Sequence, residues 1–500
     1  MKTQIAYMDT VSILRPLVLV VVLLAGCGGG SSPHSGPASD AGALSASNVN
    51  LIFVASDDVA FHGSGDINPD TSNLTNRGLQ RSLRMARFLK HRVLGGKNVN
   101  EVYALEPTSH LQTVNSYPDM AALETIQQFA LLNQITISSA LPPQFFPFTG
   151  NSYPINASYA SSGVPTGVAT PSPACPSCQG LDFADEGGDN ETLATGIITA
   201  DVPGFYVFSA PWEIVNALLA NINQIEGYHL SLPTSYAGPN LIYAISITPS
   251  GSAELITFNS KVNPPSTYPR LPGKVPRTET CTGQTLFPTI KVTAGINGAV
   301  TPMGINTNET MYIIRHADAH PLEFWTDGNY ICAGQWRALD IPNVLAEALH
   351  GKAAPQRVYS SDPSQVSPGT QNSWSGVAPA LTAEPYAIAN NLPYDLVAGF
   401  DISAPNGDLL SSNFFFTGQN LSGQTVLLAW SYQFIQPMIN QLVMSYFPPG
   451  ATPPPVPDWP DNDYDTIWTV TLDAQGNLSV DNSMCEGIDS TKLPATCPQF

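Results

Sequence analysis

The sequence of 500 residues predicts an α/β fold built from two tandem halves, each with a mainly parallel sheet covered by helices. Both halves show the same order of predicted elements: strand, loop, helix, strand, helix, strand, helix and hairpin. Short apolar strands alternate with stretches whose apolar residues recur about every 3.6 positions, which is typical of βαβ units. A Pro-rich connection, residues 261–305, separates the half at residues 49–260 from the half at residues 306–500.

The first strand of each half is a short apolar run. It covers residues 51–54 in the first half and residues 311–314 in the second. An amphipathic stretch follows each of them, at residues 79–89 and at residues 332–349, and its spacing of apolar side chains predicts a helix.

The remaining elements also occur in matching pairs. Second strands lead to Glu106 and Pro107 in one half and to Asp362 and Pro363 in the other. The other paired segments are two helices at 122–135 and 380–393, two strands at 205–209 and 426–430, each followed by a helix, and two hairpin strands at 241–247 and 467–472. Strands that alternate with helices in this way favour parallel pairing through helical crossovers.

The N-terminus predicts export. Lys2 and Arg15 precede an apolar run, residues 16–24, which is too short for the roughly 20 residues of a membrane span. The run ends in Leu-Ala-Gly-Cys27, which resembles the lipobox of bacterial lipoproteins. We expect a signal peptide at residues 1–26 and a lipidated Cys27 followed by a flexible linker to residue 48. The alternative is an ordinary signal peptide with a chance cysteine.

The location that this resemblance implies is the bacterial envelope. The lipid on Cys27 would anchor the chain, periplasm-facing or at the cell surface. Residue 28 is Gly rather than Asp, which by the same resemblance favours the outer membrane. The formal net charge of −20 disfavours nucleic acid as a partner. Any phosphate site must therefore be locally basic.

Six cysteines remain after Cys27, and an even number in an oxidising compartment predicts disulfides. The sequence leaves their connectivity open. Cys485 with Cys497 is a plausible C-terminal link, and Cys281 with Cys332 a possible link within the chain. The pair at positions 175 and 178 lies in a Pro/Ser/Gly-rich loop, where a structural disulfide is favoured over a redox motif.

Arg315 and His316 stand directly after the first strand of the second half. This pair resembles the signature of the histidine phosphatase superfamily, which includes phosphoglycerate mutases and acid phosphatases. The segments at 334–338, 358–363, 380–384 and 426–430 follow in the order of that family's motifs. The resemblance implies a three-layer α/β/α, phosphoglycerate mutase-like fold for both halves.

The resemblance also implies a phosphohistidine mechanism. His316 would attack phosphorus as a neutral imidazole, and Arg315 would bind the phosphoryl oxygens with charge-assisted hydrogen bonds. Asp318, Asp362 and Tyr432 are the candidates for further site residues, and Glu384 is another available carboxylic acid. No cofactor or metal is expected.

Part of the family's equipment is absent from the sequence. No arginine follows Pro363, where the family has a second phosphate-binding arginine, and no histidine follows the strand at 426–430. In the first half Asp57 and Asp58 stand where Arg-His is expected, so that half is a degenerate duplicate. Two functions stay open. One is a phosphohydrolase acting on a phosphorylated small molecule or phosphoprotein, and the other is an inactive pseudophosphatase serving as a binding or scaffold module.

Three other patterns carry rival interpretations. His316 and His320 have the spacing of a helical zinc pair, but Pro321 disfavours a helix there. Asp66 to Asp70 begins like a calcium loop without its glycine and distal glutamate, and a turn is expected instead. The other histidines, at positions 34, 62, 91, 110, 229 and 350, are expected to be structural or exposed.

Overall fold

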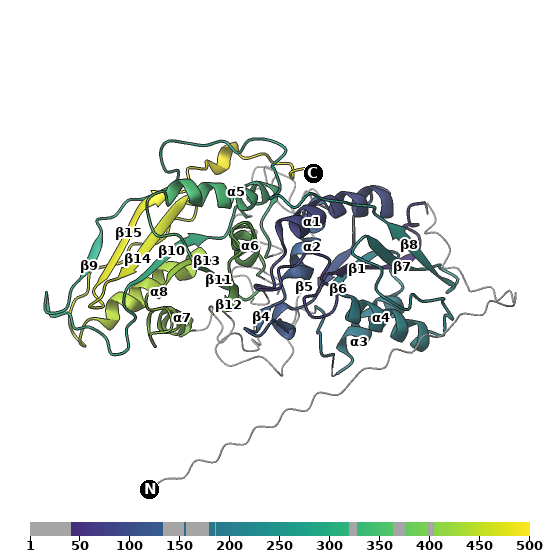
Figure 1. Cartoon of the computed structure of the whole chain (residues 1–500), viewed down its shortest axis with the longest axis horizontal. Coiled ribbons are helices and arrows are strands. Elements are labelled where there is room, and N and C mark those ends of the chain that lie inside the picture. Colours follow the sequence, from purple (N-terminus) through teal and green to yellow (C-terminus); the bar gives the residue numbers. More distant parts are fainter. Residues whose placement is uncertain are drawn as a thin grey trace, which may run out of the picture. The chain divides into compact units, whose positions relative to one another are not determined.

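Two mixed β-sheets with helices on their faces form the framework of the protein, seen in a computed structural model (Figure 1). The structure describes residues 42–133, 155–156, 180–185, 187–319, 328–363, 376–397, 402 and 405–500. The predicted signal peptide, Cys27, the cysteines at 175 and 178, and His320 lie outside these described residues.

The first sheet has six strands in the order β5-β2-β6-β1-β7-β8. Its strands are β1 (Val49–Ser56), β2 (Glu101–Ala104), β5 (Ile155–Asn156), β6 (Gly204–Pro211), β7 (Leu241–Ile247) and β8 (Ala253–Asn259). Its helices are α1 (Asn76–Phe88), α2 (Ala121–Leu132), α3 (Asp189–Ala200) and α4 (Trp212–Ile225). A separate small hairpin pairs β3 (Leu111–Gln112) with β4 (Tyr117–Pro118).

The second sheet has seven strands in the order β12-β11-β13-β10-β14-β15-β9. Its strands are β9 (Ile290–Val292), β10 (Glu309–Arg315), β11 (Arg357–Ser361), β12 (Tyr394–Val397), β13 (Thr425–Trp430), β14 (Thr466–Leu472) and β15 (Leu478–Cys485). Its helices are α5 (Cys332–Ala348), α6 (Ala378–Asn390), α7 (Gly407–Phe416) and α8 (Tyr432–Ser445).

The two sheets correspond strand by strand. β1 pairs in parallel with β6 and antiparallel with β7, and β10 pairs in the same two ways with β13 and β14. The predicted α/β class is therefore confirmed. Each half adds a strand and a helix to the predicted order, β5 with α3 in one and β12 with α7 in the other. Both sheets are mixed: four parallel strands are joined to the antiparallel strands β7 and β8 in the first sheet and to β14, β15 and β9 in the second.

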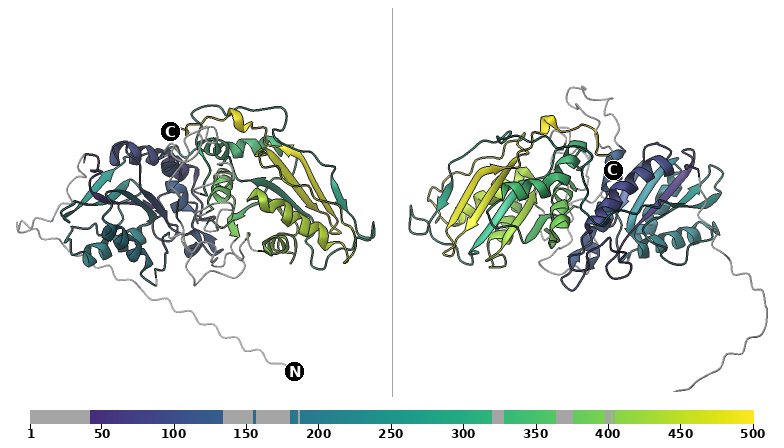
Figure 2. Two further views of the ribbon diagram at one scale, coloured as in Figure 1. Left: turned by 180° about the vertical axis from the view of Figure 1, so that it is seen from behind. Right: turned by 45° about the horizontal axis from the view of Figure 1, so that its top comes forward.

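Alternation along the central strands produces the layering. In β10, Tyr312 and Ile314 pack in one hydrophobic cluster with α5 and α6, whereas Met311 and Ile313 pack in another with α7 and α8. The ribbon views of Figure 2 show helices on both faces of the sheet. Successive side chains of a strand point to opposite faces, so both faces of the sheet need a helical cover. β1 alternates in the same way between a face covered by α1 and α2 and a face covered by α3 and α4.

One hydrophobic cluster includes helices of both halves. Leu123 and Phe129 of α2 belong to the same cluster as Leu381 of α6. Gln127 of α2 donates a hydrogen bond of 2.9 Å to the Asn329 side chain. The described residues fall into one compact unit, within residues 40–500.

A glycine at the same place in α1 and α5 permits close packing against the loop that follows the first strand. A side chain at Gly78 would collide with the carbonyl oxygen of Asp66, and one at Gly334 with the carbonyl oxygen of Asp318. Each glycine is followed three residues later by an arginine, Arg81 or Arg337. This shared detail shows that the two halves resemble each other beyond the order of their strands.

The disulfides differ from the suggested pairings. Cys281 is bonded to Cys485, and Cys332 is bonded to Cys497. The suggested pairs 485–497 and 281–332 are therefore wrong. The C-terminal segment crosses the start of α5, where the Trp336 indole donates to the Thr496 carbonyl, and this crossing brings Cys497 to Cys332 rather than to Cys485.

Several elements were not predicted from the sequence. These include α3, α7, β3, β4, β5, β12 and β9, the last of which lies inside the Pro-rich connection and pairs with β15. Among the residues that the structure describes, none of the helices combines the length and hydrophobicity needed to cross a membrane.

Candidate functional site around Arg315 and His316

The Arg-His pair lies at the C-terminal end of β10, in the middle of the second sheet. Arg315 is opposite Trp430 of β13, and the backbone N–H of His316 donates to the Trp430 carbonyl over 3.1 Å. The carboxyl ends of adjacent parallel strands form the edge where open α/β sheets bind ligands. The pair therefore lies where the sequence predicted it, at the C-terminal end of the first strand of the second half.

The guanidinium of Arg315 is held on two faces and at one nitrogen. Its Cζ lies 3.9 Å from the centre of the Tyr432 ring and 3.7 Å from that of Tyr464. Nη1 donates to the carbonyl oxygens of Asp461, at 2.8 Å, and Asp463, at 3.2 Å. Stacking between two rings fixes the plane of the guanidinium and leaves its edges as the only directions for further hydrogen bonds.

Arg315 is a buried cation whose hydrogen bonds go to backbone carbonyls. Its residue is 3% exposed, and within the described part of the chain no acceptor is found for its Nε–H. Burial lowers the pKa of Arg315, although Tyr464 and Tyr432 oppose that effect. A buried donor without an acceptor is costly unless a ligand or water satisfies it.

His316 has the protonation state of a nucleophile. Its Nδ1 lies 2.9 Å from the Ala317 carbonyl oxygen, so Nδ1 carries the proton and the ring's lone pair is on Nε2. Burial, reinforced by the Arg315 charge, lowers the pKa of His316 to about 3. The imidazole is therefore neutral over the whole physiological range. It is also 1% exposed, so a group bound there would be shielded from water.

Of the three further candidates, the structure brings Tyr432 to the pair. Its ring centre lies 6.1 Å from that of His316, and burial raises its pKa to about 12. Tyr432 is the first residue of α8, directly after β13 and the linking Ser431.

Asp318 is engaged elsewhere. Its Oδ2 accepts a 2.6 Å hydrogen bond from Arg337 Nε, and Arg337 also pairs with Glu486. Burial disfavours the charge on Arg337, but the two carboxylates outweigh it and raise the pKa of the guanidinium. We conclude that Asp318 positions α5 against the strand end, because its carboxylate already carries a full charge-assisted bond.

Asp362 and Glu384 each lie beside a carboxyl group of the first half. Burial and then Asp362 raise the pKa of Glu106 well above its ordinary value. Burial, and after it the neighbouring Glu124, likewise raises the pKa of Glu384 well above its ordinary value.

Tyr464 is the contributor to the site that the sequence did not reveal. It lies in the loop before β14, among acidic residues in a Pro-rich segment. Its ring centre is 5.9 Å from that of His316, nearly perpendicular to it. No sequence spacing links residue 464 to residue 315. The one feature of the sequence that could have pointed to Tyr464 is its place as an aromatic residue just before β14, the strand that pairs with β10.

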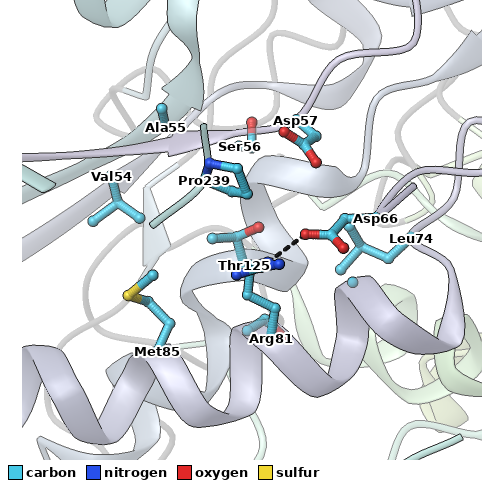
Figure 3. Close-up of a pocket in the computed structure, with 12 residues that line it drawn as sticks. Val54, Ala55, Ser56, Asp57, Asp66, Leu74, Arg81, Met85, Thr125 and Pro239 are labelled. Atoms are coloured by element: carbon cyan, nitrogen blue, oxygen red, sulfur yellow. Dashed lines mark hydrogen bonds and ion pairs between the residues drawn. The ribbon is translucent and has the colours of Figure 1, made fainter. Parts of the chain in front are cut away.

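The corresponding edge of the first sheet is acidic. A small cavity there, of about 20 Å³, is lined by residues that include Ser56, Asp57, Asp66 and Arg81 (Figure 3). That volume holds about one water. Asp66 pairs with Arg81, just as Asp318 pairs with Arg337, so the calcium-loop interpretation fails and Asp66 has a structural partner. Asp57 accepts from Ser64 and Tyr236.

Comparisons with known proteins give a distant likeness of fold. No family model matches the chain, and no curated protein matches its sequence. Solved structures resemble part of it, among them the following three. Phosphoserine phosphatase from Entamoeba histolytica has 16% identity over 43% of this chain and 98% of its own, with a TM-score of 0.25.

The other two are bacterial. A putative phosphohistidine phosphatase SixA from Agrobacterium tumefaciens has 16% identity, covers 33% of this chain and 93% of its own, and gives a TM-score of 0.19. A putative α-ribazole-5′-P phosphatase from Escherichia coli has 13% identity, covers 37% of this chain and 99% of its own, and gives a TM-score of 0.21. These scores are too low to carry an inference about activity, which must come from the site itself.

Proposed function

We propose that the chain is a phosphohydrolase of the histidine phosphatase type, acting through a phosphohistidine at His316. The supporting observation is the buried Arg315 guanidinium, whose described polar partners are carbonyl oxygens and whose Nε–H has no acceptor in the described part of the chain. An anion beside the neutral imidazole would satisfy that donor and balance the charge. A phosphate monoester supplies such an anion.

The chemistry divides into two displacements. In the first, the Nε2 lone pair forms a bond to phosphorus while the bond from phosphorus to the ester oxygen breaks, and the released oxygen takes up a proton. In the second, water attacks phosphorus, the P–N bond breaks, and inorganic phosphate leaves. Arg315 stabilises the transferring group in both steps, because its plane is fixed before the substrate binds.

The second candidate function is an inactive binding module, and burial favours it. Arg315 and His316 are 3% and 1% exposed, and the sequence lacks the second arginine and second histidine of the family pattern. Loss of two such groups, at about 2–4 kcal/mol each, would slow turnover by several powers of ten. We therefore expect any hydrolysis to be slow.

The same proposal includes the architecture and the location. We take the halves as two tandem phosphoglycerate mutase-like domains, supported by the identical pairing of β1, β6 and β7 and of β10, β13 and β14. We take Cys27 as the lipid attachment site of an envelope lipoprotein, supported by the lipobox-like sequence and the linker that follows it.

The test is hydrolysis of p-nitrophenyl phosphate by the mature chain beside His316→Ala and the control His350→Ala, which changes an exposed histidine. We expect slow release that falls at least about 100-fold in His316→Ala and is unchanged in the control. Vanadate binding is measured in parallel. Binding without turnover supports the inactive module. Turnover that survives His316→Ala, or neither binding nor turnover, overturns the phosphohistidine proposal.

A further inference from the structure

Three buried side chains with metal-binding atoms converge in the first half, away from the Arg-His pair in sequence. Asp58 follows β1, His110 follows the short helical turn after β2, and Asp119 directly precedes the start of α2. Asp58 and Asp119 are fully buried and His110 is 8% exposed. None of the three has a part in the proposed phosphoryl chemistry.

The distances within this trio, which we call the Asp-His-Asp cluster, are short. His110 Nδ1 lies 2.9 Å from Asp119 Oδ2 and 3.3 Å from Asp58 Oδ2, and the three atoms all lie within 4.8 Å of one another. Ligands bound at about 2.0–2.2 Å in tetrahedral or octahedral geometry are separated by about 3.0–3.4 Å. The observed spacing therefore already approximates one face of a coordination polyhedron.

In each aspartate, backbone hydrogen bonds to Oδ1 orient the carboxylate. Asp58 Oδ1 accepts hydrogen bonds from the backbone N–H groups of Ala60, at 2.7 Å, and Phe61, at 3.0 Å. Asp119 Oδ1 accepts from Ala121 N–H at 3.1 Å. In both residues Oδ1 is thus fixed by the backbone and Oδ2 is aimed into the cluster. Such outer hydrogen bonds are what orient the carboxylate ligands of metal sites.

The imidazole is also held in place. The His110 ring lies flat on Phe183, with ring centres 3.6 Å apart and an interplanar angle of 4°. This stacking leaves Nδ1 in the plane that faces the two carboxylates. A ring fixed in this way loses little conformational freedom when it binds a ligand.

Asp58 supplies the independent sign of a missing ligand. Its Oδ2 is buried and accepts no hydrogen bond from the described residues, although the His110 ring lies within ion-pair distance at 3.3 Å. No lysine or arginine of the described chain forms an ion pair with either aspartate, so His110 is their single basic neighbour there.

We infer that the Asp-His-Asp cluster binds one divalent transition-metal ion of the zinc type, through Asp58 Oδ2, His110 Nδ1 and Asp119 Oδ2. One imidazole and two carboxylates suit zinc, whereas calcium and magnesium prefer oxygen ligands alone. The ion neutralises two buried carboxylates and joins the segment after β1 to the segments before and after the β3–β4 hairpin. The inference does not depend on the proposed function, because His316 takes no part in it.

The test uses the full mature chain after chelator treatment and dialysis. Zinc binding is followed by calorimetry, and Co²⁺ is used as a spectroscopic probe of the same site. We expect one zinc ion per chain and visible Co²⁺ absorption bands. His110→Ala should weaken zinc binding by more than about 100-fold, since even the loss of an outer-sphere partner costs 10–100-fold.

Two further variants make the result decisive. Asp119→Asn keeps the volume of the side chain and should also abolish the Co²⁺ bands, with the fold checked by circular dichroism. His91→Ala is the matched control, because His91 is an exposed histidine of the same half. Absence of zinc binding by the unmodified chain, or equal binding by the His110→Ala and His91→Ala proteins, overturns the inference.

Discussion

Glu124 of α2 and Glu384 of α6 are buried carboxyl groups that lie next to each other between the two halves of the chain. Within the described part of the chain, no N–H or hydroxyl group donates to either oxygen of Glu384. Two carboxylates cannot both be charged in such a place, so the pair holds a proton. The contact between α2 and α6 therefore depends on pH.

The first prediction concerns this pair. Burial raises the pKa of Glu124 from its ordinary 4.5 to about 7, and burial with Glu124 raises that of Glu384 well above its ordinary value. A raised carboxyl pKa stabilises the fold below the unfolded value, and this contribution is lost as the pH rises through about 7. We expect Glu124→Gln to remove on the order of 3 kcal/mol of pH-dependent stability between pH 5 and pH 8.

Urea denaturation at these two pH values measures the effect. The groups that face the pair are Asp119, Tyr268, Tyr330 and Tyr394, and burial raises the pKa of each of these tyrosines well above its ordinary value. Glu347→Gln, on the exposed side of α5, is the control and should keep the unmodified pH dependence. An identical pH dependence in Glu124→Gln would contradict the assignment.

The second prediction concerns the stacking on Arg315. Tyr464→Leu removes one of the two rings and should lower the free energy of unfolding by about 1–2 kcal/mol, since a desolvated cation–π contact is worth about that much. Tyr464→Phe keeps the ring and is the control. Thermal unfolding measures both. Equal losses in the Leu and Phe variants would show that the hydroxyl, rather than the aromatic face, supports Arg315.

The third prediction concerns the disulfides. Peptide mapping without reduction should recover Cys281 joined to Cys485 and Cys332 joined to Cys497. Cys497→Ser should destabilise the chain by about 4 kcal/mol, because the bond closes a long loop in the unfolded state. Recovery of the pairs 281–332 or 485–497 would contradict the structure.

The fourth prediction concerns the lipid. Cys27→Ala should move the protein from the membrane fraction to the soluble fraction after expression in a bacterial host. The reason is that the apolar run at residues 16–24 is too short to anchor the chain by itself. Membrane attachment that persists in the variant would count against lipidation.

Much of the framework was predictable because it depends on local patterns. β10 and β13 are apolar runs of the right length, so the position of Arg315 at a strand end followed directly. α3 was not predicted because few of its residues are buried, among them Ala194 and Ile197, and its apolar periodicity is weak. β5, β9 and β12 are only two to four residues long, too short for a periodic signal.

The contents of the site were less predictable because they depend on tertiary contacts. Tyr464 reaches Arg315 from a loop that is distant in sequence, and Asp318 pairs with Arg337. His110 was expected to be structural or exposed, and it is buried with two aspartates as partners that the sequence did not indicate. In each case the packing of loops at the sheet edge determines the partner. Spacing along the chain does not predict such contacts.

The most direct measurement for the central claim is detection of phosphohistidine. The mature chain is incubated with a phosphoramidate or acetyl phosphate donor, and the phosphorylated peptide is located by mass spectrometry under alkaline conditions that preserve P–N bonds. We predict an acid-labile phosphoryl group on His316 that is absent from His316→Ala. No phosphoryl group on His316, with the control variant His350→Ala giving the same blank result, would contradict it.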